Sequence, residues 1–353
     1  MITLTDIADH ICGGGATIHQ VMSRINRTPY LFQVVVDDAG GFLGTVTDGD
    51  IRRAMLAAKT LDAPIADCMR TDAVVGRIGD DDGNVAKLFA IRTTVPFLPV
   101  LDEAGKVLSV LVAADPPSGC RTALIMAGGL GRRLGEHTKA TPKPLVKVGD
   151  KPILQHVLEH AEAAGVRDAY VSVHHMAEQI EAFVAGRNGG ARVHLVHEDE
   201  PLGTAGAIGK LPEAPKDPLL VLNGDVLTQV DLIALLAFHR RHNHDATIAV
   251  ALHEEEIPFG VIRHNEDGLF LGIEEKPVIR HHVAAGIYCL APEICALVPR
   301  DAAMDMPELL NMARGAGLRV GLFPIHEYWR DIGRPDDLES AQNDHGRRHG
   351  AEQ

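Results

Sequence analysis

The segment 127–134, which reads Ala-Gly-Gly-Leu-Gly-Arg-Arg-Leu, constrains this chain more than any other part of it. Gly128, Gly129 and Gly131 follow the apolar run 122–127. A buried strand therefore ends where the backbone must turn sharply and can approach a ligand closely. Backbone N–H groups in such a turn can face phosphate oxygens. The pattern predicts a phosphate-binding loop, although a glycine turn alone also suits an ordinary strand-to-helix connection.

Two cations favour the phosphate interpretation. Arg133 offers a planar fork for phosphate, and Lys143 is a point charge whose backbone is restricted by Pro142 and Pro144. A Walker loop would end in Gly-Lys-Ser/Thr, and a dinucleotide fingerprint would read G-x-G-x-x-G, so neither motif fits. The combination predicts a nucleoside triphosphate site of another class.

Two carboxylates stand where a metal ion would be useful. Asp225 follows the apolar run 219–222, at the carboxyl end of an expected strand, where open α/β sheets bind ligands. Asp331 lies in the segment 329–335, Trp-Arg-Asp-Ile-Gly-Arg-Pro. Mg²⁺ usually takes one or two carboxylates together with substrate phosphates, so we expect Mg²⁺ at this pair. Alternatively, Asp225 is a strand-end turn residue and Asp331 a helix cap.

These motifs together resemble the signature of sugar-1-phosphate nucleotidyltransferases, G-G-x-G-T-R-L…P-K-P, over residues from about 122 to 340. Arg132 stands where that family usually has threonine, and it either contacts the triphosphate or points into solvent. The resemblance implies an α/β nucleotide-diphospho-sugar transferase fold, Rossmann-like, with a mixed but mostly parallel sheet. Alternating strand-like and helix-like patterns after residue 122 favour the same class.

The resemblance also implies site residues, some of them in the segments 200–208 and 274–277. Taken alone, the second segment would be an exposed turn, and Thr204 in the first would be a helix cap. The implied catalytic residues are Arg133, Lys143, Asp225 and Lys276. The implied nucleotide-binding residues are Ala127, Gly128, Gly129, Gly131, Glu200, Gly203 and Thr204. The implied sugar-binding residues are Asn223, Gly260, Glu274 and Gly286, and the implied metal ligands are Asp225 and Asp331.

The implied reaction transfers a nucleotidyl group from a nucleoside triphosphate to a sugar 1-phosphate and releases pyrophosphate. The sequence is similar to mannose-1-phosphate guanylyltransferases, which favours GTP with a glucosamine, mannose or related hexose 1-phosphate. Ala284 stands where relatives commonly have asparagine, which removes an expected sugar contact. Thymidylyl, uridylyl or cytidylyl transfer stays open, as does a catalytically inactive regulatory protein that only binds nucleotide.

The first third of the chain contains an internal repeat. Residues 36–43 align with 101–108 at an offset of 65, and each copy reads strand, turn, strand. This part resembles a tandem CBS module, an α+β unit, whose T-x-x-D motif fits Thr47 and Asp50 and implies an adenine nucleotide site. A CBS pair ahead of this catalytic domain resembles guanylyltransferases of nonulosonic (legionaminic-type) acid pathways. The alternative is a spacer or dimerisation unit that binds nothing.

We expect a CBS pair at 1–116, a linker at 117–121 with its prolines beginning at 116, and a transferase domain at 122–345. The second copy has Val112 and Asp115 at the motif positions, so a single nucleotide site is expected. Paired CBS modules often associate in the proteins they resemble, which implies a homo-oligomer.

Composition indicates a globular protein: 46% of its 353 residues are hydrophobic and 23% are charged. The formal net charge of −14 argues against a nucleic-acid partner. No apolar run reaches the ~20 residues of a membrane span and the start lacks a signal-peptide pattern, so we expect a cytoplasmic protein without a membrane partner. Five scattered cysteines and nineteen histidines show no spacing typical of a disulfide framework or a zinc site.

Overall fold

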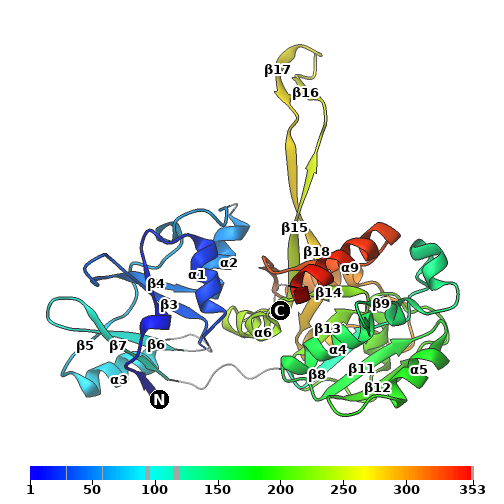
Figure 1. The fold of residues 1–353 in the computed structure, drawn as a ribbon, viewed down its shortest axis with the longest axis horizontal. Coiled ribbons are helices and arrows are strands. Elements are labelled where there is room, and N and C mark those ends of the chain that lie inside the picture. Colours follow the sequence, from blue (N-terminus) through cyan, green and yellow to red (C-terminus); the bar gives the residue numbers. More distant parts are fainter. Residues whose placement is uncertain (29, 58, 92–95, 114–119, 351–353) are drawn as a thin grey trace.

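The computed structural model describes residues 1–28, 30–57, 59–91, 96–113 and 120–350. Figure 1 shows two bodies side by side, helix α6 (Leu232–Arg241) between them, and a two-stranded stalk that rises from the second body. Asp115 and most of the expected linker at 117–121 lie outside the described residues.

The first body contains two small sheets, in the orders β1-β7-β6-β5 and β2-β3-β4. Its strands are β1 (Ile2–Leu4), β2 (Ile11–Gly13), β3 (Phe32–Val36), β4 (Phe42–Thr47), β5 (Gly76–Arg77), β6 (Phe97–Leu101) and β7 (Val107–Val112). Its helices are α1 (Ile18–Ile25), α2 (Asp48–Leu56) and α3 (Asp81–Ala90), with short 3₁₀ turns η1 (Ala8–His10) and η2 (Ile65–Asp67).

The structure confirms that the repeat is a strand, a turn and a strand in both copies. In the first turn Gly40 N donates to the Asp37 carbonyl at 3.0 Å, and in the second Gly105 N donates to the Asp102 carbonyl at 3.1 Å. Both glycines have φ near +80°, a conformation that costs glycine little. The first copy then continues into α2, whose N-cap is Thr47, as the polar start of that segment predicts.

The second body is built on a seven-stranded sheet in the order β12-β11-β8-β13-β18-β15-β19. Of its adjacent pairs, β18 is antiparallel to both neighbours and the others are parallel, so the sheet is mixed and mostly parallel, as the sequence predicts. The strands of this body are β8 (Thr122–Met126), β9 (Lys147–Val148), β10 (Lys151–Pro152), β11 (Asp168–Val173), β12 (Arg192–His197), β13 (Leu219–Asn223), β14 (Val226–Thr228), β15 (Ala246–Glu256), β16 (Gly260–His264), β17 (Phe270–Glu275), β18 (Val278–Leu290), β19 (Val320–Pro324) and β20 (Trp329–Asp331).

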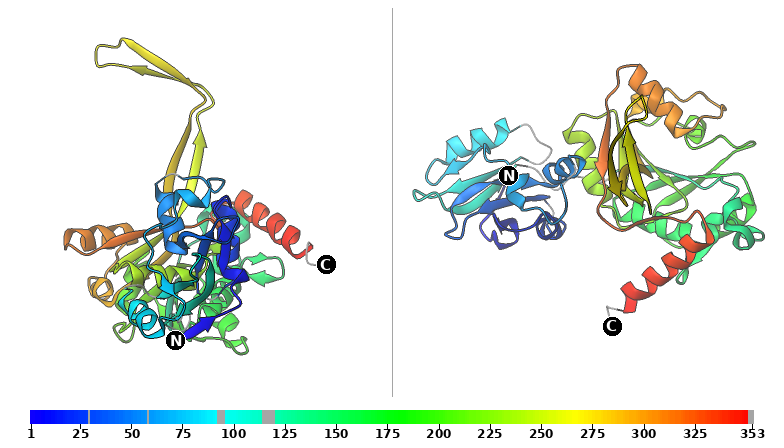
Figure 2. Two further views of the ribbon diagram at one scale, coloured as in Figure 1. Left: turned by 90° about the vertical axis from the view of Figure 1, so that its left-hand side faces the viewer. Right: turned by 90° about the horizontal axis from the view of Figure 1, so that it is seen from above.

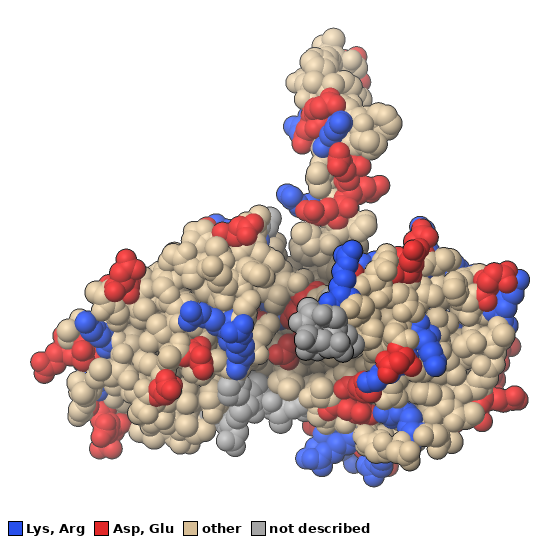
Figure 3. Space-filling view, in the orientation of Figure 1, with Lys and Arg blue, Asp and Glu red and all other residues tan. Residues whose placement is uncertain are grey.

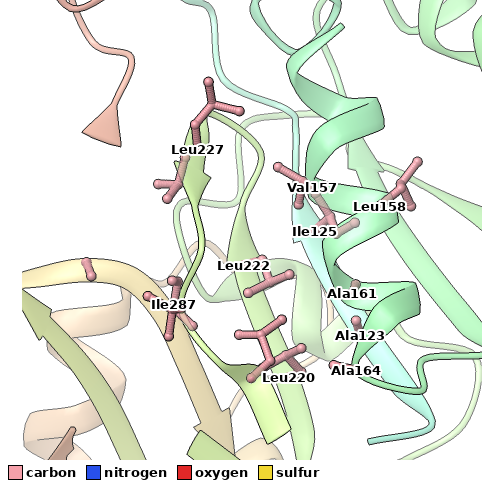
Figure 4. Close-up of a cluster of buried hydrophobic side chains, with 14 of the residues drawn as sticks. Ala123, Ile125, Val157, Leu158, Ala161, Ala164, Leu220, Leu222, Leu227 and Ile287 are labelled. Carbon is pink, nitrogen blue, oxygen red and sulfur yellow. The ribbon is translucent and has the colours of Figure 1, made fainter. Parts of the chain in front are cut away.

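Helices cover both faces of this sheet. They are α4 (Ile153–Ala163), α5 (Ala177–Ala185), α6, α7 (Pro292–Cys295), α8 (Met306–Gly315) and α9 (Pro335–Gly350), with 3₁₀ turns η3 (Arg132–Thr138), η4 (Lys143–Leu145) and η5 (Gly206–Lys210). Side chains alternate along each central strand: Ile125 and Leu222 pack toward Val157 of α4 (Figure 4), while Leu124 and Val221 belong to a second core that includes residues of α7 and α8. The site therefore rests on strands fixed from both sides.

The second body also carries a long two-stranded projection, the stalk. Strands β15 and β18 run beyond the edge of the core as a two-stranded ribbon, and β16 and β17 continue it to the tip (Figures 1 and 2). We call residues 252–282 the arm. The strand-like patterns after residue 122 did not indicate that these strands leave the core.

The two bodies meet around Arg52 of α2, which is completely buried. Its guanidinium lies 2.8 Å from Asp48, 2.9 Å from Glu327 of the second body and 3.6 Å from the ring centre of Phe323. Burial would lower the pKa of Arg52, but the two carboxylates outweigh it and raise the pKa.

Within the described residues, no helix has both the length and the apolar character to cross a bilayer.

Candidate active site

The glycine loop lies at the carboxyl end of β8, as the sequence predicts. Gly131 has φ +62°, and a Cβ on it would lie 3.0 Å from Cβ of Lys143 and 3.1 Å from Cγ2 of Thr138. The hydroxyl of Thr138 donates to the Gly131 carbonyl at 3.0 Å and so fixes the backbone of the loop at Gly131. Glycine is therefore needed at 131 both for its backbone conformation and for the approach of Lys143.

Lys143 is the buried cation of the site, with 8% of its surface exposed. Its Nζ lies 2.5 Å from Oδ2 of Asp225, and η4 fixes its backbone between two prolines. The pair brings the P-K-P motif to the carboxyl end of β13, across 82 residues of sequence. Arg133 is exposed, and a Cβ on Gly333 would lie 3.6 Å from its Nη1, so Arg133 is near the segment that holds Asp331.

Asp225 and Asp331 are brought together by a short sheet of their own. Strand β14 pairs with β20 so that Val226 faces Asp331, and Ile332 N donates to the Asp225 carbonyl at 3.0 Å. Burial and then the Asp225 carboxylate raise the pKa of Asp331, against the opposing effect of Lys143 and Arg133. Two carboxylates held this close favour a cation between them.

The same two side chains each keep a buried oxygen without a hydrogen-bond partner among the described residues, namely Oδ1 of Asp225 and Oδ1 of Asp331. A buried carboxylate oxygen without a donor is costly unless a ligand completes it. Two carboxylates with free oxygens fit Mg²⁺, which takes its remaining ligands from phosphate and water. The described residues contain no group of three or more His, Cys, Asp or Glu side chains that could hold a metal ion.

Asn223 and Gly286, two of the expected sugar contacts, touch each other. Gly286 has φ +71°, and a Cβ on it would lie only 2.6 Å from Nδ2 of Asn223. Trp329, which sequence reasoning did not select, donates from Nε1 to the Ala285 carbonyl at 2.7 Å and so ties β20 to β18 at this point. A cavity of about 840 Å³, lined by Asn223 and by residues of α4 and β14, opens on this side.

The segment 200–208 lies beside the glycine loop through Glu198, a buried residue that the motif search missed. Glu198 accepts a hydrogen bond from Leu202 N at 3.0 Å, and a Cβ on Gly128 would lie 3.1 Å from its Oε1. Its position at the end of β12 is the sequence signal that could have identified it. Glu200 and Gly203 are exposed in this segment.

Thr204 is a cap, but of a different helix from the one expected. Its hydroxyl oxygen accepts a hydrogen bond from Met306 N at 2.7 Å, at the first residue of α8. Its own segment forms only the 3₁₀ turn η5, whose N-cap is Ala205. The cap interpretation is therefore wrong for the local helix, because the partner lies a hundred residues away.

Three expected site residues, Gly260, Glu274 and Lys276, lie on the arm. Glu274 pairs with Arg263 across the ribbon, and Lys276 has φ +46°, in the left-handed region that non-glycine residues seldom adopt. Lys276 lies ten residues before Gly286, and most of the residues between them belong to β18. At about 3.3 Å per strand residue, Lys276 is ~30 Å from Gly286. The structure thus does not bring these three residues to the Asp225 cluster of their own chain.

Thr47 and Asp50 form a second candidate site, in a cavity of about 150 Å³ at the start of α2. Asp50 is buried, accepts from the Thr47 hydroxyl at 2.5 Å and pairs with Arg53 and with Arg70, the latter at 3.0 Å. Burial would raise the pKa of Asp50, but these partners and Arg241 lower it. Arg241, the last residue of α6, also lines this cavity, so the second body forms one of its walls.

Comparison with known proteins gives the family. A model of the nucleotidyl transferase family matches residues 122–348, and a CBS domain model matches residues 10–57. The mannose-1-phosphate guanylyltransferase catalytic subunit beta of Drosophila pseudoobscura pseudoobscura is 36% identical over 224 residues, which cover 61% of this chain and 60% of the relative. The mannose-1-phosphate guanyltransferase of Schizosaccharomyces pombe is 35% identical over 227 residues, which cover 61% of each. The chain thus spans about 60% of the length of these relatives.

Solved structures agree on the fold. A crystal structure of HddC from Yersinia pseudotuberculosis complexed with GMP-PN has a TM-score of 0.50 and 26% identity, covering 64% of this chain and all of HddC. A UDP-glucose pyrophosphorylase from Acinetobacter baumanii, at 21% identity and a TM-score of 0.52, covers 65% of this chain and 94% of its own and shows the fold alone. With its glycine loop, its paired carboxylates and a family match over more than half of its length, this chain belongs to the nucleotidyl transferase family, and its transferase body is preceded by a CBS domain.

Proposed function

We propose that this protein transfers a nucleotidyl group from a nucleoside triphosphate to a sugar 1-phosphate. An oxygen of the sugar phosphate attacks the α-phosphorus in line, the bond from that phosphorus to the bridging oxygen breaks, and pyrophosphate leaves. The observation that carries the proposal is the cluster of Lys143, Asp225 and Asp331 at the strand end beside the glycine loop, with two carboxylate oxygens that lack partners.

Each residue has a part in this scheme. The backbone of Gly128, Gly129 and Gly131 gives phosphate oxygens N–H donors without side-chain obstruction. Lys143 and Arg133 neutralise the charge that grows on the departing pyrophosphate. Asp225 and Asp331 would hold Mg²⁺, which when bound lowers the repulsion between the two phosphate groups. No covalent enzyme intermediate is needed, because positioning and charge neutralisation suffice for phosphoryl chemistry.

GTP and a hexose 1-phosphate are the proposed substrates. Support comes from the names of the curated relatives, which are mannose-1-phosphate guanylyltransferases, and from HddC, which was crystallised with GMP-PN. Sugar contacts are assigned to Asn223 and Gly286, which meet at the end of β13. Ala284 in place of asparagine leaves a sugar hydroxyl without one donor, so the preferred sugar can differ from mannose. We place the reaction in the cytoplasm, where nucleoside triphosphates are available.

The test is pyrophosphate release by the full chain with Mg²⁺, using GTP, UTP, CTP, dTTP and ATP against a panel of sugar 1-phosphates. Release that requires GTP and one hexose 1-phosphate supports the proposal. Release with another nucleotide would reassign the base but keep the reaction. Nucleotide binding without any release would instead favour a regulatory protein. Asp225→Asn should abolish release, whereas the matched variant Asp336→Asn, at an exposed position of α9, should not.

We propose further that the cavity at Thr47 and Asp50 binds an adenine nucleotide. Support comes from the guanidinium groups of Arg70 and Arg241, which line the cavity, and from that of Arg53, which pairs with Asp50; guanidinium groups suit phosphate oxygens. A cavity of about 150 Å³ is smaller than the ~300 Å³ of ordinary ligand pockets, so a nucleotide would have to displace part of this lining. Calorimetry with AMP, ADP and ATP on the full chain tests the assignment, and no heat with any of them would refute it.

A further inference from the structure

The arm is a two-stranded ribbon made of two successive ladders. Its ladder runs from the pair Leu252 and His282 to the pair Glu256 and Val278, and then from Gly260 and Glu275 to His264 and Phe270. Backbone bonds bridge the junction: Ile257 N donates to the Pro277 carbonyl at 3.0 Å, and Lys276 N to the Phe259 carbonyl at 3.3 Å. These two bonds join the ladders, so the arm projects from its own body as an extended ribbon.

The arm is also covered with apolar side chains that face solvent. Figure 3 shows a charged neck and a largely uncharged end. Nine large hydrophobic residues of the arm are exposed, among them Ile262 at 51%, Leu271 at 67% and Ile273 at 58%; the others are Leu252, Phe259, Leu269, Phe270, Val278 and Ile279. Ile262 and Ile273 are direct cross-strand partners, so they form one apolar face.

Such a ribbon needs a partner. A two-stranded hairpin alone is marginally stable in water, and exposed apolar strands invite association. The arm carries seven carboxylates and three Lys or Arg residues, whereas the stretch 132–147 around the active site carries five Lys or Arg residues and one carboxylate. Lys143 is buried, so the exposed part of this stretch carries four Lys or Arg residues and one carboxylate. The two surfaces therefore have opposite charge, and both are present on every copy of this chain.

The arm also carries residues that a substrate site could use. Glu274 and Lys276 follow the apolar Ile273 in sequence, and Lys276 has a left-handed backbone just after the end of β17. Strained backbone of this kind clusters at functional sites. At ~30 Å from Gly286 of its own chain, Lys276 is too far to contact a substrate phosphate held beside Gly286 in this conformation of the chain.

We propose that the arm of one copy docks over the active site of a second copy and delivers Lys276 to the sugar phosphate there. The exchange is reciprocal, so a two-fold dimer contains two sites, each built from two chains. This inference rests on the proposed function for the role of Lys276, although arm docking itself can be tested without any turnover.

The first test is the mass of the full chain by sedimentation equilibrium, compared with the triple variant Ile262→Lys, Leu271→Lys, Ile273→Lys. We expect a dimer for the natural sequence and at least a ~100-fold weaker dimer for the variant, since three buried charges would replace apolar contacts. The control Met312→Lys, at an exposed apolar residue of α8, should leave the dimer unchanged. A monomeric natural chain, or a variant that dimerises as well as the natural chain, refutes the proposal.

The second test is complementation between Asp225→Asn and Lys276→Ala, which are each expected to be inactive. Co-expressed with different tags, they should recover about a quarter of the natural rate, because half of random dimers are mixed and each mixed dimer has one site free of both substitutions. If the arm acts on its own chain, every active site contains one of the two substitutions and no activity returns. That result would refute the delivery of Lys276 to the second copy.

A third measurement separates this inference from the proposed function. Isotopically heavy and light copies are mixed and treated with an amine cross-linker; a heavy–light bond between Lys276 and Lys139 supports arm exchange even if the natural chain releases no pyrophosphate. Only same-isotope Lys276–Lys139 bonds, or none to Lys139 at all, would refute arm exchange. Absence of turnover beside a heavy–light bond would refute the proposed function alone.

Discussion

Arg241 donates a hydrogen bond of 2.6 Å to the hydroxyl oxygen of Thr47, across 194 residues of sequence. The bond joins the end of α6 in the transferase body to the N-cap of α2 in the CBS domain. Any ligand that binds at Thr47 must therefore meet a side chain of the other body. A binding event at this cavity can change the contact between the two bodies, which is the physical requirement for coupling them.

Arg241→Met should weaken binding of an adenine nucleotide to the full chain by at least ~10-fold, because a charge-assisted hydrogen bond to phosphate contributes ~1.5–3 kcal/mol. Calorimetry with AMP and ATP measures the change. The matched control is Arg314→Met, at an exposed position of α8 that does not line the cavity, and it should bind as the natural chain does. Equal affinity of Arg241→Met and the natural chain would remove Arg241 from the site.

Arg52→Met should weaken the contact between the two bodies by about 3–5 kcal/mol, because it leaves Asp48 and Glu327 buried without their cation. Small-angle X-ray scattering should show a larger radius of gyration for the variant as the CBS domain separates. Arg27→Met, at an exposed arginine of the same domain, should scatter like the natural chain. An unchanged radius for Arg52→Met would mean that other contacts hold the bodies together.

The same contact should weaken in acid. Burial would raise the pKa of Glu327, but Arg52 and His326 outweigh it and lower the pKa to about 2. A lowered carboxylate pKa contributes stability that is complete above its usual value of ~4.3 and disappears as pH falls toward 2. The radius of gyration should therefore rise between about pH 4.5 and pH 2. Arg52→Met should lose this dependence, and a natural chain that stays compact to pH 2 would contradict the assignment.

The sequence predicted those site residues that follow buried strands. Asp225 and the glycine loop could be placed because apolar runs of four to six residues predict strands, and parallel strands in an α/β sheet present their ends at one edge. Asp331 was placed by its motif, and the short β14–β20 pairing explains why it meets Asp225. In these cases the local pattern carries the information.

What the sequence did not predict depends on contacts between distant segments. Thr204 caps α8 a hundred residues later, and Arg52 reaches Glu327 across 275 residues. No periodicity records such pairs. The arm is a similar case: strand-like patterns after residue 122 could not tell a buried sheet from an exposed ribbon, since the same pattern suits both.

His239 should make the protein sensitive to mild acid. It is buried, its Nδ1 lies 3.0 Å from the Thr247 hydroxyl, and burial lowers its pKa to about 4. A histidine held neutral in the folded state contributes fully above its usual pKa of ~6.5, and stability falls as pH drops from there toward 4. Between pH 7 and pH 5 this one group should cost about 2 kcal/mol of unfolding free energy.

The variant His239→Gln keeps a side chain that can bond Thr247 but does not titrate. Its free energy of unfolding in urea should fall less between pH 7 and pH 5 than that of the natural chain. The control His137→Gln, at an exposed position, should keep the natural dependence. Parallel curves for His239→Gln and the natural chain would show that His239 does not cause the effect.

Lys143→Ala tests the charge neutralisation directly. Removal of a positioned donor from a transition state commonly costs ~10²–10³-fold in rate, and we expect a loss of at least ~10²-fold in pyrophosphate release. Because Lys143 also pairs with Asp225 at 2.5 Å, the variant leaves two neighbouring carboxylates with one cation fewer, and higher Mg²⁺ should recover part of the loss. Lys147→Ala, an exposed lysine four residues later, is the matched control and should keep its rate. Near-normal turnover of Lys143→Ala at all Mg²⁺ concentrations would show that the departing pyrophosphate is held by other groups.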